Sequence, residues 1–343
     1  MHAPSRKHFF CALLCLASVF VASTVTAQVS ECGKKRGVGQ QALDETTWKR
    51  LNSAYEDVGK EHYDDAYDKL EALLKRARGK YLQAVLYQAL AQVEWSRKHY
   101  DAALTDFEKA VDLNALPDET HFSLMYQIAQ LYYMKERYDD ALAKLELWMC
   151  KVPKDKVTAS AWMLKASIYA QKKDWKNVIP AVGQAISMSQ DPKESWYQLQ
   201  LAAYFELEQF PKAAQTLETM IRHWPNKKDY WLQLSQIDYK LKRDDKALAV
   251  LALAYRRGML DKQGDILFLA NLYIDRNVPL KAAQVLQKGI EDGIVKPTRQ
   301  HLTMMADAWY SAEEIEKSLA AYEKAGKASD DGEIDLRRAY LLV

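Results

Sequence analysis

Apolar and polar residues follow each other along most of this chain with the spacing of amphipathic helices. Between Thr47 and Gly332, apolar side chains recur every three or four positions, and this period predicts α-helices, since one helical turn takes 3.6 residues. A four-residue motif, which we call the mark, recurs eight times. It consists of an aromatic or polar residue, two variable residues and a small residue, and successive small residues lie 34 to 38 positions apart. Each interval between marks holds two helices. The marks are 63–66, 100–103, 138–141, 175–178, 210–213, 244–247, 279–282 and 315–318.

Small residues on both helices of each pair predict close helix–helix packing. Alanine recurs in the first helix, as at Ala91 and Ala129, and near the start of the second helix, as at Ala103 and Ala141. Larger residues such as Leu251 are expected between neighbouring pairs. Because one pair cannot bury its apolar face alone, stability must come from stacking.

This pattern resembles the tetratricopeptide repeat, a helix–turn–helix unit of about 34 residues. The third unit carries the match in Ala129, Tyr132, Ala141, Leu145 and Pro153. The resemblance covers about 47–332 in eight units and implies an all-α fold, an α–α superhelix of eight helix-turn-helix repeats.

Two departures from the tetratricopeptide pattern lie in the first helices. Asp57 and Glu94 stand where the family has an aromatic residue.

The first 27 residues are typical of a secretory signal peptide. Arg6 and Lys7 precede an apolar run of about 13 residues, and Ala27 closes a stretch of small residues. The alternative is an uncleaved anchor, but the run is shorter than the roughly 20 residues that span a bilayer. We expect cleavage after Ala27, an amino-terminal arm over 28–46, and an exported chain. By its likeness to exported tetratricopeptide proteins of Gram-negative bacteria, the chain is expected in the periplasm.

The last residues, 333–343, resemble the start of a ninth first helix, with Arg338 and Ala339 at core positions. Residues 339–343 are apolar, and no second helix follows to cover them. We expect a chain that is truncated at Val343. The alternatives are a helix that caps the eighth unit on one face, or one that supplies a dimer contact.

Charge and cysteine content limit the partners. Without the signal peptide the chain has 46 basic and 46 acidic residues, which argues against a nucleic acid or an anionic membrane surface as a partner.

Two cysteines, Cys32 and Cys150, remain without the signal peptide. In an oxidising compartment they either form a disulfide, which we expect, or stay two unrelated thiols.

The chain lacks the motifs of an enzyme. Its five remaining histidines show no metal-ligand spacing, and the Gly-x-Ser-x-Gly, phosphate-loop and His-Glu-x-x-His motifs are absent. Acid pairs such as Asp64/Asp65 and Asp139/Asp140 recur before the second helices, where we expect them to cap the helices and complement the dipole. We predict no catalysis, no cofactor and no metal.

The family resemblance places a binding groove on the first helices of the pairs. The positions that face this groove in the family carry aromatic residues beside amides, a combination that suits an extended peptide. The alternative is that the rings serve packing alone. The groove positions carry glutamine, tyrosine, serine and alanine instead of the Lys/Asn/Arg clamp that captures chaperone C-termini in this family. The expected groove residues are Gln88, Gln92, Trp95, Tyr126, Gln130, Tyr133, Gln198, Phe205, Gln236, Tyr239, Asn271 and Tyr310.

Two functions fit these features. The first is a periplasmic scaffold that binds a protein or peptide in its groove, and the resemblance adds an association with TonB-type envelope systems. The second is a glycan-binding scaffold of envelope polysaccharide export, because rings beside amides also suit sugars.

Overall fold

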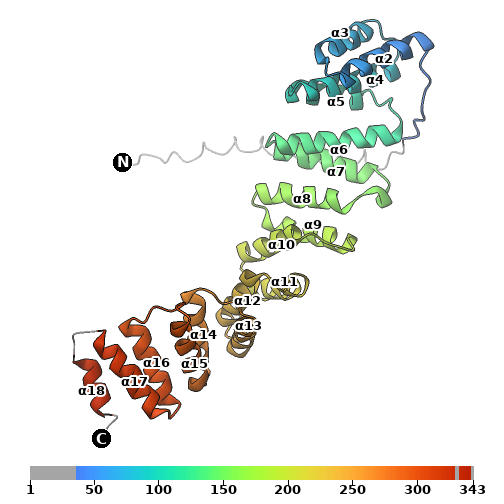
Figure 1. Cartoon of the computed structure of the whole chain (residues 1–343). Helices are drawn as coiled ribbons and strands as arrows, with labels where there is room; N and C mark the ends of the chain where they lie inside the picture. The colour runs from blue at the N-terminus through green and yellow to red at the C-terminus, as the bar shows by residue number, and fades with distance from the viewer. Residues whose placement is uncertain (1–35, 329–331, 341–343) are drawn as a thin grey trace, which may run out of the picture. The chain divides into compact units, whose positions relative to one another are not determined.

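A computed structural model describes residues 36–328 and 332–340. Within these residues the chain forms seventeen α-helices, one short 3₁₀ helix and no β-strand (Figure 1). The predicted all-α fold of helix-turn-helix repeats is thereby confirmed. The expected signal peptide, Cys32 and residues 341–343 lie outside the described part.

The chain divides after Gln190 into two compact units. The first holds four antiparallel helix pairs, in which the first helix is called A and the second B. A short 3₁₀ helix, η1 (Lys154–Lys156), links the third and fourth pairs. The pairs are α2 (Glu45–Gly59) with α3 (Tyr63–Leu74), α4 (Lys80–Ser96) with α5 (Tyr100–Asp112), α6 (Asp118–Met134) with α7 (Tyr138–Lys151), and α8 (Ala159–Gln171) with α9 (Trp175–Met188).

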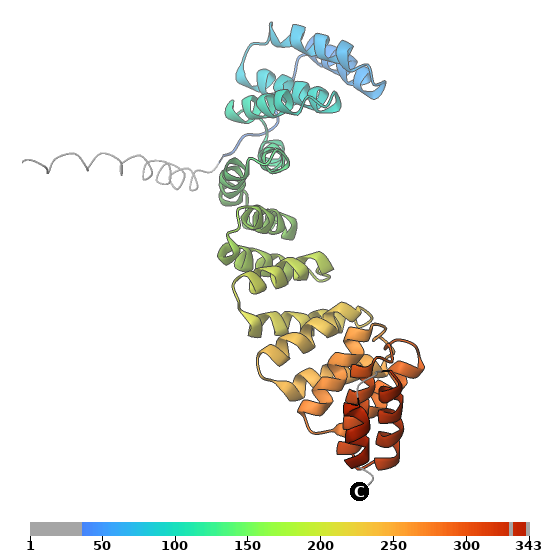
Figure 2. The same ribbon diagram turned by 90° about the vertical axis from the view of Figure 1, so that its left-hand side faces the viewer.

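The second unit starts at Asp191 and holds four further pairs and one additional helix. Neighbouring helices of this unit lie side by side in both views (Figures 1 and 2). The helices are α10 (Glu194–Glu206) with α11 (Phe210–His223), α12 (Lys228–Lys240) with α13 (Asp244–Arg256), α14 (Gln263–Asp275) with α15 (Pro279–Glu291), α16 (Arg299–Ser311) with α17 (Ile315–Lys327), and α18 (Glu333–Tyr340).

Every B helix begins at the first residue of a sequence mark, and the small residues lie where two helices touch. Ala91, Ala103, Ala129 and Ala141 are fully buried. In two pairs a serine replaces the alanine, and its hydroxyl donates to a carbonyl of the partner helix: Ser235 Oγ to Ala247 O at 2.8 Å. The small side chain therefore serves close approach, and its polar version remains satisfied inside the core.

Each turn between helices A and B uses one non-glycine residue with positive φ. Lys98, for example, has φ 64°, and the next amide, His99 N, donates to Glu94 O at 2.8 Å. This is the Schellman motif, which ends many helices and in which the residue with positive φ is usually glycine. The other residues of this kind are Glu61, Glu136, Lys173, Glu208, Lys242, Asn277 and Glu313.

We expect Lys98→Gly to raise the free energy of unfolding by about 0.5–1 kcal/mol, because glycine adopts positive φ without the steric cost of a Cβ atom. Urea denaturation followed by circular dichroism measures the change. Lys98→Ala is the matched control, since it removes the same side chain but retains Cβ, and it should leave the stability nearly unchanged. Equal effects of the two variants would contradict the explanation.

The acid pairs do not cap the B helices, which corrects one expectation. The N-cap residues are His62, Arg137 and Arg243 in three of these turns, without a side-chain capping bond. The acids lie in the first turn of the helix, where they complement the dipole. Asp64 and Asp245 also form ion pairs with basic residues at the end of the next A helix.

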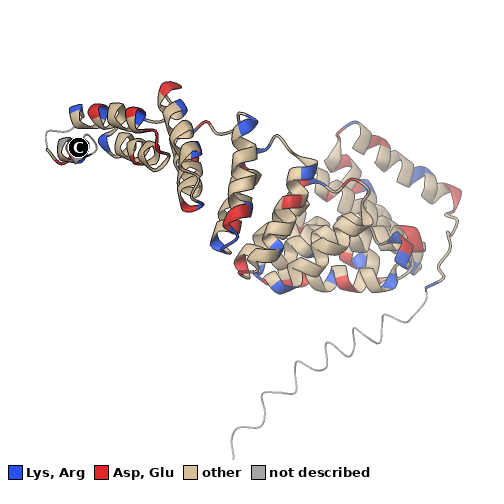
Figure 3. Ribbon diagram, turned by 90° about the horizontal axis from the view of Figure 1, so that it is seen from below, with Lys and Arg blue, Asp and Glu red and all other residues tan. Residues whose placement is uncertain are grey.

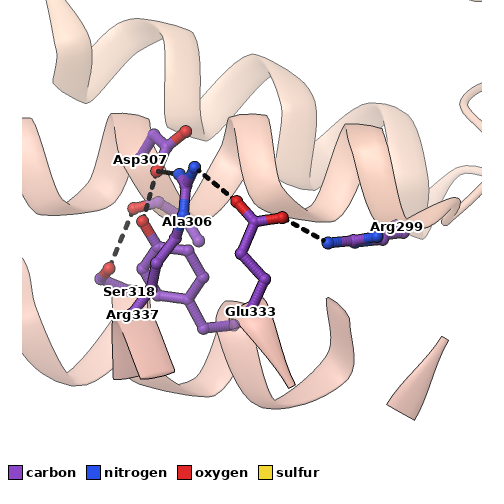
Figure 4. Close-up of polar contacts among 7 residues, drawn as sticks. Arg299, Ala306, Asp307, Ser318, Glu333 and Arg337 are labelled. Carbon is purple, nitrogen blue, oxygen red and sulfur yellow. Dashed lines mark hydrogen bonds and ion pairs between the residues drawn. The ribbon is translucent and has the colours of Figure 1, made fainter. Parts of the chain in front are cut away.

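Helix α18 packs on α17 of the last complete pair (Figure 1), and Figure 4 shows its polar contacts with residues of α16. Ile334 is 2% exposed and joins the apolar cluster that contains Trp309. Glu333 bridges Arg299 and Arg337 at 3.0 Å each. The helix thus occupies the position that a ninth A helix would take on α16 and α17.

Cys150, in the last turn of α7, takes part in a disulfide. The expected partner, Cys32, lies outside the described residues, so this pairing stays a prediction.

Candidate functional site

The twelve expected groove residues all lie on A helices, in both units. Three of them, Gln88, Tyr126 and Tyr133, are half-buried. The exposed residues are Gln92, Trp95, Gln130, Gln198, Phe205, Gln236, Tyr239, Asn271 and Tyr310.

Four of the twelve meet at one cavity in the first unit. The cavity has a volume of about 510 Å³ and opens between α4, α6 and α8, with one residue from α5. We call it the α4–α6–α8 groove. It is lined by Gln92, Trp95, Phe107, Gln127, Gln130, Leu131, Tyr133, Met134 and Leu164.

The floor and the rim of this groove differ in accessibility. Phe107 and Leu131 are 5% and 3% exposed and form an apolar floor that belongs to the core. Trp95 and Met134 on the rim are 38% and 64% exposed. Large apolar side chains that stay in solvent around a concavity are typical of binding sites, because their burial by a partner is favourable.

Neighbouring rings fix the orientation of the two aromatic side chains. The Trp95 ring packs edge-on against Tyr100, with centroids 5.1 Å apart and planes at 69°. Tyr133 packs against Tyr138 at 5.8 Å and 56°. Because rings held in this way lose little rotamer freedom on binding, they are suited to act as anchors.

The groove lining carries no charged side chain. The carboxylate of Glu94, the residue before Trp95, does not line the groove. Glu94 is 4% exposed and contacts His99 Nδ1 at 2.7 Å and Arg97 Nη1 at 3.2 Å. Consecutive residues of α4 therefore serve different roles, because successive helical positions lie about 100° apart. The acid replaces the family's aromatic residue inside the helix pair, and the ring faces the groove.

Tyr126 and Gln88 do not line the α4–α6–α8 groove. Tyr126 instead packs against Trp148 of α7, with centroids 4.9 Å apart. Burial raises the pKa of Tyr126, so the side chain remains a neutral phenol at physiological pH.

The expected residues of the second unit are exposed, but two of them form hydrogen bonds with other side chains. Gln198 donates to the Tyr230 hydroxyl at 3.1 Å, and the Tyr239 hydroxyl donates to Asp275 at 3.3 Å. A cavity of about 590 Å³ in this unit lies between α15, α16 and α17, and none of the expected residues lines it. The stronger candidate site is therefore the α4–α6–α8 groove.

Sequence reasoning missed five residues of the groove. Gln127 and Met134 lie three positions before and four positions after Gln130, so helical spacing alone places them on the same face. Phe107, Leu131 and Leu164 carry no such signal, since they come from the core and from other helices.

The described residues contain no group of three or more His, Cys, Asp or Glu side chains arranged for a metal. Basic and acidic residues alternate over the helices of each unit (Figure 3). Within the same residues, no helix combines the length and apolar character needed to cross a membrane.

Comparison with known proteins supports the repeat family. Two segments, residues 89–149 and 201–261, match the tetratricopeptide repeat family model. A search of curated protein sequences gives no match.

Among solved structures, the chain is similar to a tetratricopeptide repeat protein from Parabacteroides merdae, with 11% identity and a TM-score of 0.44. That match covers 87% of this chain and 99% of the other. The C-terminal part of a TPR repeat-containing protein from Cytophaga hutchinsonii is 14% identical, with a TM-score of 0.43 and coverage of 85% and 99%. MamA from Desulfovibrio magneticus is 16% identical, with a TM-score of 0.43 and coverage of 54% and 99%.

Proposed function

We propose that this chain of tetratricopeptide-type repeats is a non-enzymatic scaffold that binds an extended segment of a protein partner in the α4–α6–α8 groove. One observation carries the proposal: the groove combines exposed apolar anchors with three glutamines and no charge. Tetratricopeptide repeats serve protein–protein interaction in general, and the exposed anchors of this groove support that role for this chain.

The chemistry of the lining favours an uncharged peptide. A glutamine amide offers two donors and an acceptor, which match the N–H and C=O groups of a peptide backbone. Trp95 supplies a rigid apolar surface for partner side chains, and Met134 an adaptable one. A charged partner side chain would lose its hydration there without gaining an opposite charge, so specificity for neutral segments follows.

We place this function in the periplasm of a Gram-negative bacterium, with a TonB-type envelope system as a candidate context. The support for export is the basic and apolar pattern of residues 1–27 in the sequence. Amino-terminal sequencing of the protein recovered from the periplasmic fraction tests it. The proposal expects a chain that begins at Gln28, and recovery of the full chain in the cytoplasm would contradict it.

The double substitution Trp95→Ala with Tyr133→Ala should weaken peptide binding roughly 10- to 100-fold, since aromatic anchors at the centre of an interface dominate its affinity. The probe is a peptide selected on the wild-type protein from a phage-displayed random library, and titration calorimetry measures its affinity. Thermal unfolding of the same variant should change less than that of a core variant, because Trp95 is 38% exposed and Tyr133 is only half-buried.

The matched control is Tyr239→Ala with Tyr310→Ala. These rings occupy the same repeat position but lie outside the groove, and they are 39% and 49% exposed. The control should bind the peptide as the wild type does. If both double variants lose affinity equally, or if the groove variant loses as much stability as a core variant, the groove is not the site.

A glycan ligand is the second candidate, because exposed rings beside amides also suit sugars. Trp95 is the residue that favours it, because over a third of its surface is free and it lines the same cavity as Gln92 and Gln130. A glycan array probed with the wild type and the groove variant separates the two functions. Binding of a polysaccharide that the groove variant loses, together with no peptide selected, would replace the peptide by a glycan.

A further inference from the structure

The segment before the first helix, residues 36–44, contacts a distant helix pair. We call this segment the clasp. Arg36 Nη2 donates to Leu116 O at 2.8 Å, and Arg36 Nη1 lies 3.3 Å from Asp118 Oδ1. Figures 1 and 2 show the segment leaving α2 and reaching the start of α6.

A backbone pairing adds to this contact. Asp118 N donates to Val38 O at 3.2 Å, and Val38 N donates to Asp118 Oδ1 at 3.4 Å. The Arg36 side chain is only 8% exposed. Within the described residues Nε and Nη1 have no hydrogen-bond partner, so the bond of Nη2 to Leu116 O and the ion pair with Asp118 are the contacts that offset the burial of this guanidinium.

The other end of the clasp belongs to the first two pairs. Leu43 packs on the apolar cluster that α2, α3 and α4 share. Asp44 then caps α2, with Thr47 N donating to its Oδ1 atom at 2.9 Å. The clasp therefore links the apolar cluster that α2, α3 and α4 share to the start of α6, across 80 residues of sequence.

This connection is unusual for a repeat array. In such arrays each repeat contacts only its neighbours, so the terminal repeats open most readily. Here the contacts of Arg36 and Val38 must break before the first two pairs can separate from the third.

We propose that the clasp makes the first two helix pairs open together with the third, so that α2–α5 are protected as well as an internal repeat. The occupant of the α5–α6 corner is thus the chain's own amino-terminal segment. This inference does not depend on the proposed function, but it concerns helices that also line the groove, because the clasp contacts the start of α6 and the apolar cluster that includes α4.

Native-state hydrogen exchange with mass spectrometry tests the clasp on residues 28–343, purified under oxidising conditions. Arg36→Ala should accelerate exchange of the α2–α5 amides at least tenfold and leave α10–α17 unchanged. Arg50→Ala is the matched control, since it removes an exposed arginine from α2 and should exchange as the wild type does.

Asp118→Asn provides the second variant, which weakens the same ion pair from its other side. It should accelerate the same α2–α5 amides, and the effect of both substitutions together should be smaller than the sum of the two single effects, because the two residues share the ion pair. If Arg36→Ala does not fold, Asp118→Asn alone decides. Unchanged α2–α5 exchange in the folded variants, or equal acceleration in α10–α17, would overturn the proposal.

Discussion

Leu251→Ala should lower the free energy of unfolding of the second unit by about 2–5 kcal/mol, the usual cost of removing a leucine from a filled core. Leu251 is fully buried in α13, within the apolar cluster that the pairs α12–α13 and α14–α15 share. Its removal leaves a cavity at the contact between repeats, and this contact supplies most of the stability of an array.

The same helix offers a matched control two positions away. Leu253 is 46% exposed on the opposite face of α13, so Leu253→Ala should change the stability by less than about 0.5 kcal/mol. Hydrogen exchange of the α12–α15 amides in the full chain measures both. A similar loss in the two variants would mean that helix propensity, and not packing between repeats, sets the stability of the unit.

Lowering the pH from 7 to 5 should destabilise the first unit by about 2 kcal/mol through His121 alone. His121 is 3% exposed, and burial, with a smaller contribution from Arg36, lowers its pKa from 6.5 to about 4. The unfolded chain therefore takes up a proton below pH 6.5 that the folded chain refuses until about pH 4. The contribution of His121 to the stability is therefore fully present above pH 6.5 and is lost as the pH falls towards 4.

The charged groups near His121 act in both directions. Lys151 and Lys144 lower its pKa further, and Asp118 raises it. His121→Leu removes the titrating group without leaving a hydrogen-bond partner of Nδ1 behind, because that atom has no such partner among the residues that the structure describes. Urea denaturation at pH 7 and pH 5 should show a smaller pH dependence in the variant. An unchanged pH dependence would assign the effect to other groups.

The fold followed from the sequence because the repeat constrains it many times over. Ala103 and Ala141 are predicted helix contacts, and both are fully buried. An alanine at one place is weak evidence, but eight marks in phase leave a single arrangement that buries every apolar face. The turn geometry was not predictable in the same way. Lys98 adopts positive φ without being glycine, since the closure of the helix pair imposes that conformation.

The site was only partly predictable. The sequence placed Gln92, Trp95, Gln130 and Tyr133 on one expected surface, and these four line one cavity. It gave equal weight to Tyr126, which packs on Trp148 instead. Position in the repeat determines on which side of the helix a side chain lies, but the neighbouring helix determines whether it meets a cavity or another ring.

By itself, the sequence determined the helices, their pairing and the small residues at their contacts, because the periodicity is local and recurs in every repeat. Only the tertiary structure decided which exposed residues share a groove, and that Arg36 docks at Leu116 and Asp118. Contacts between residues 80 positions apart have no periodic signal. They form only after the first three pairs have stacked, because the stacking brings the two segments within contact distance.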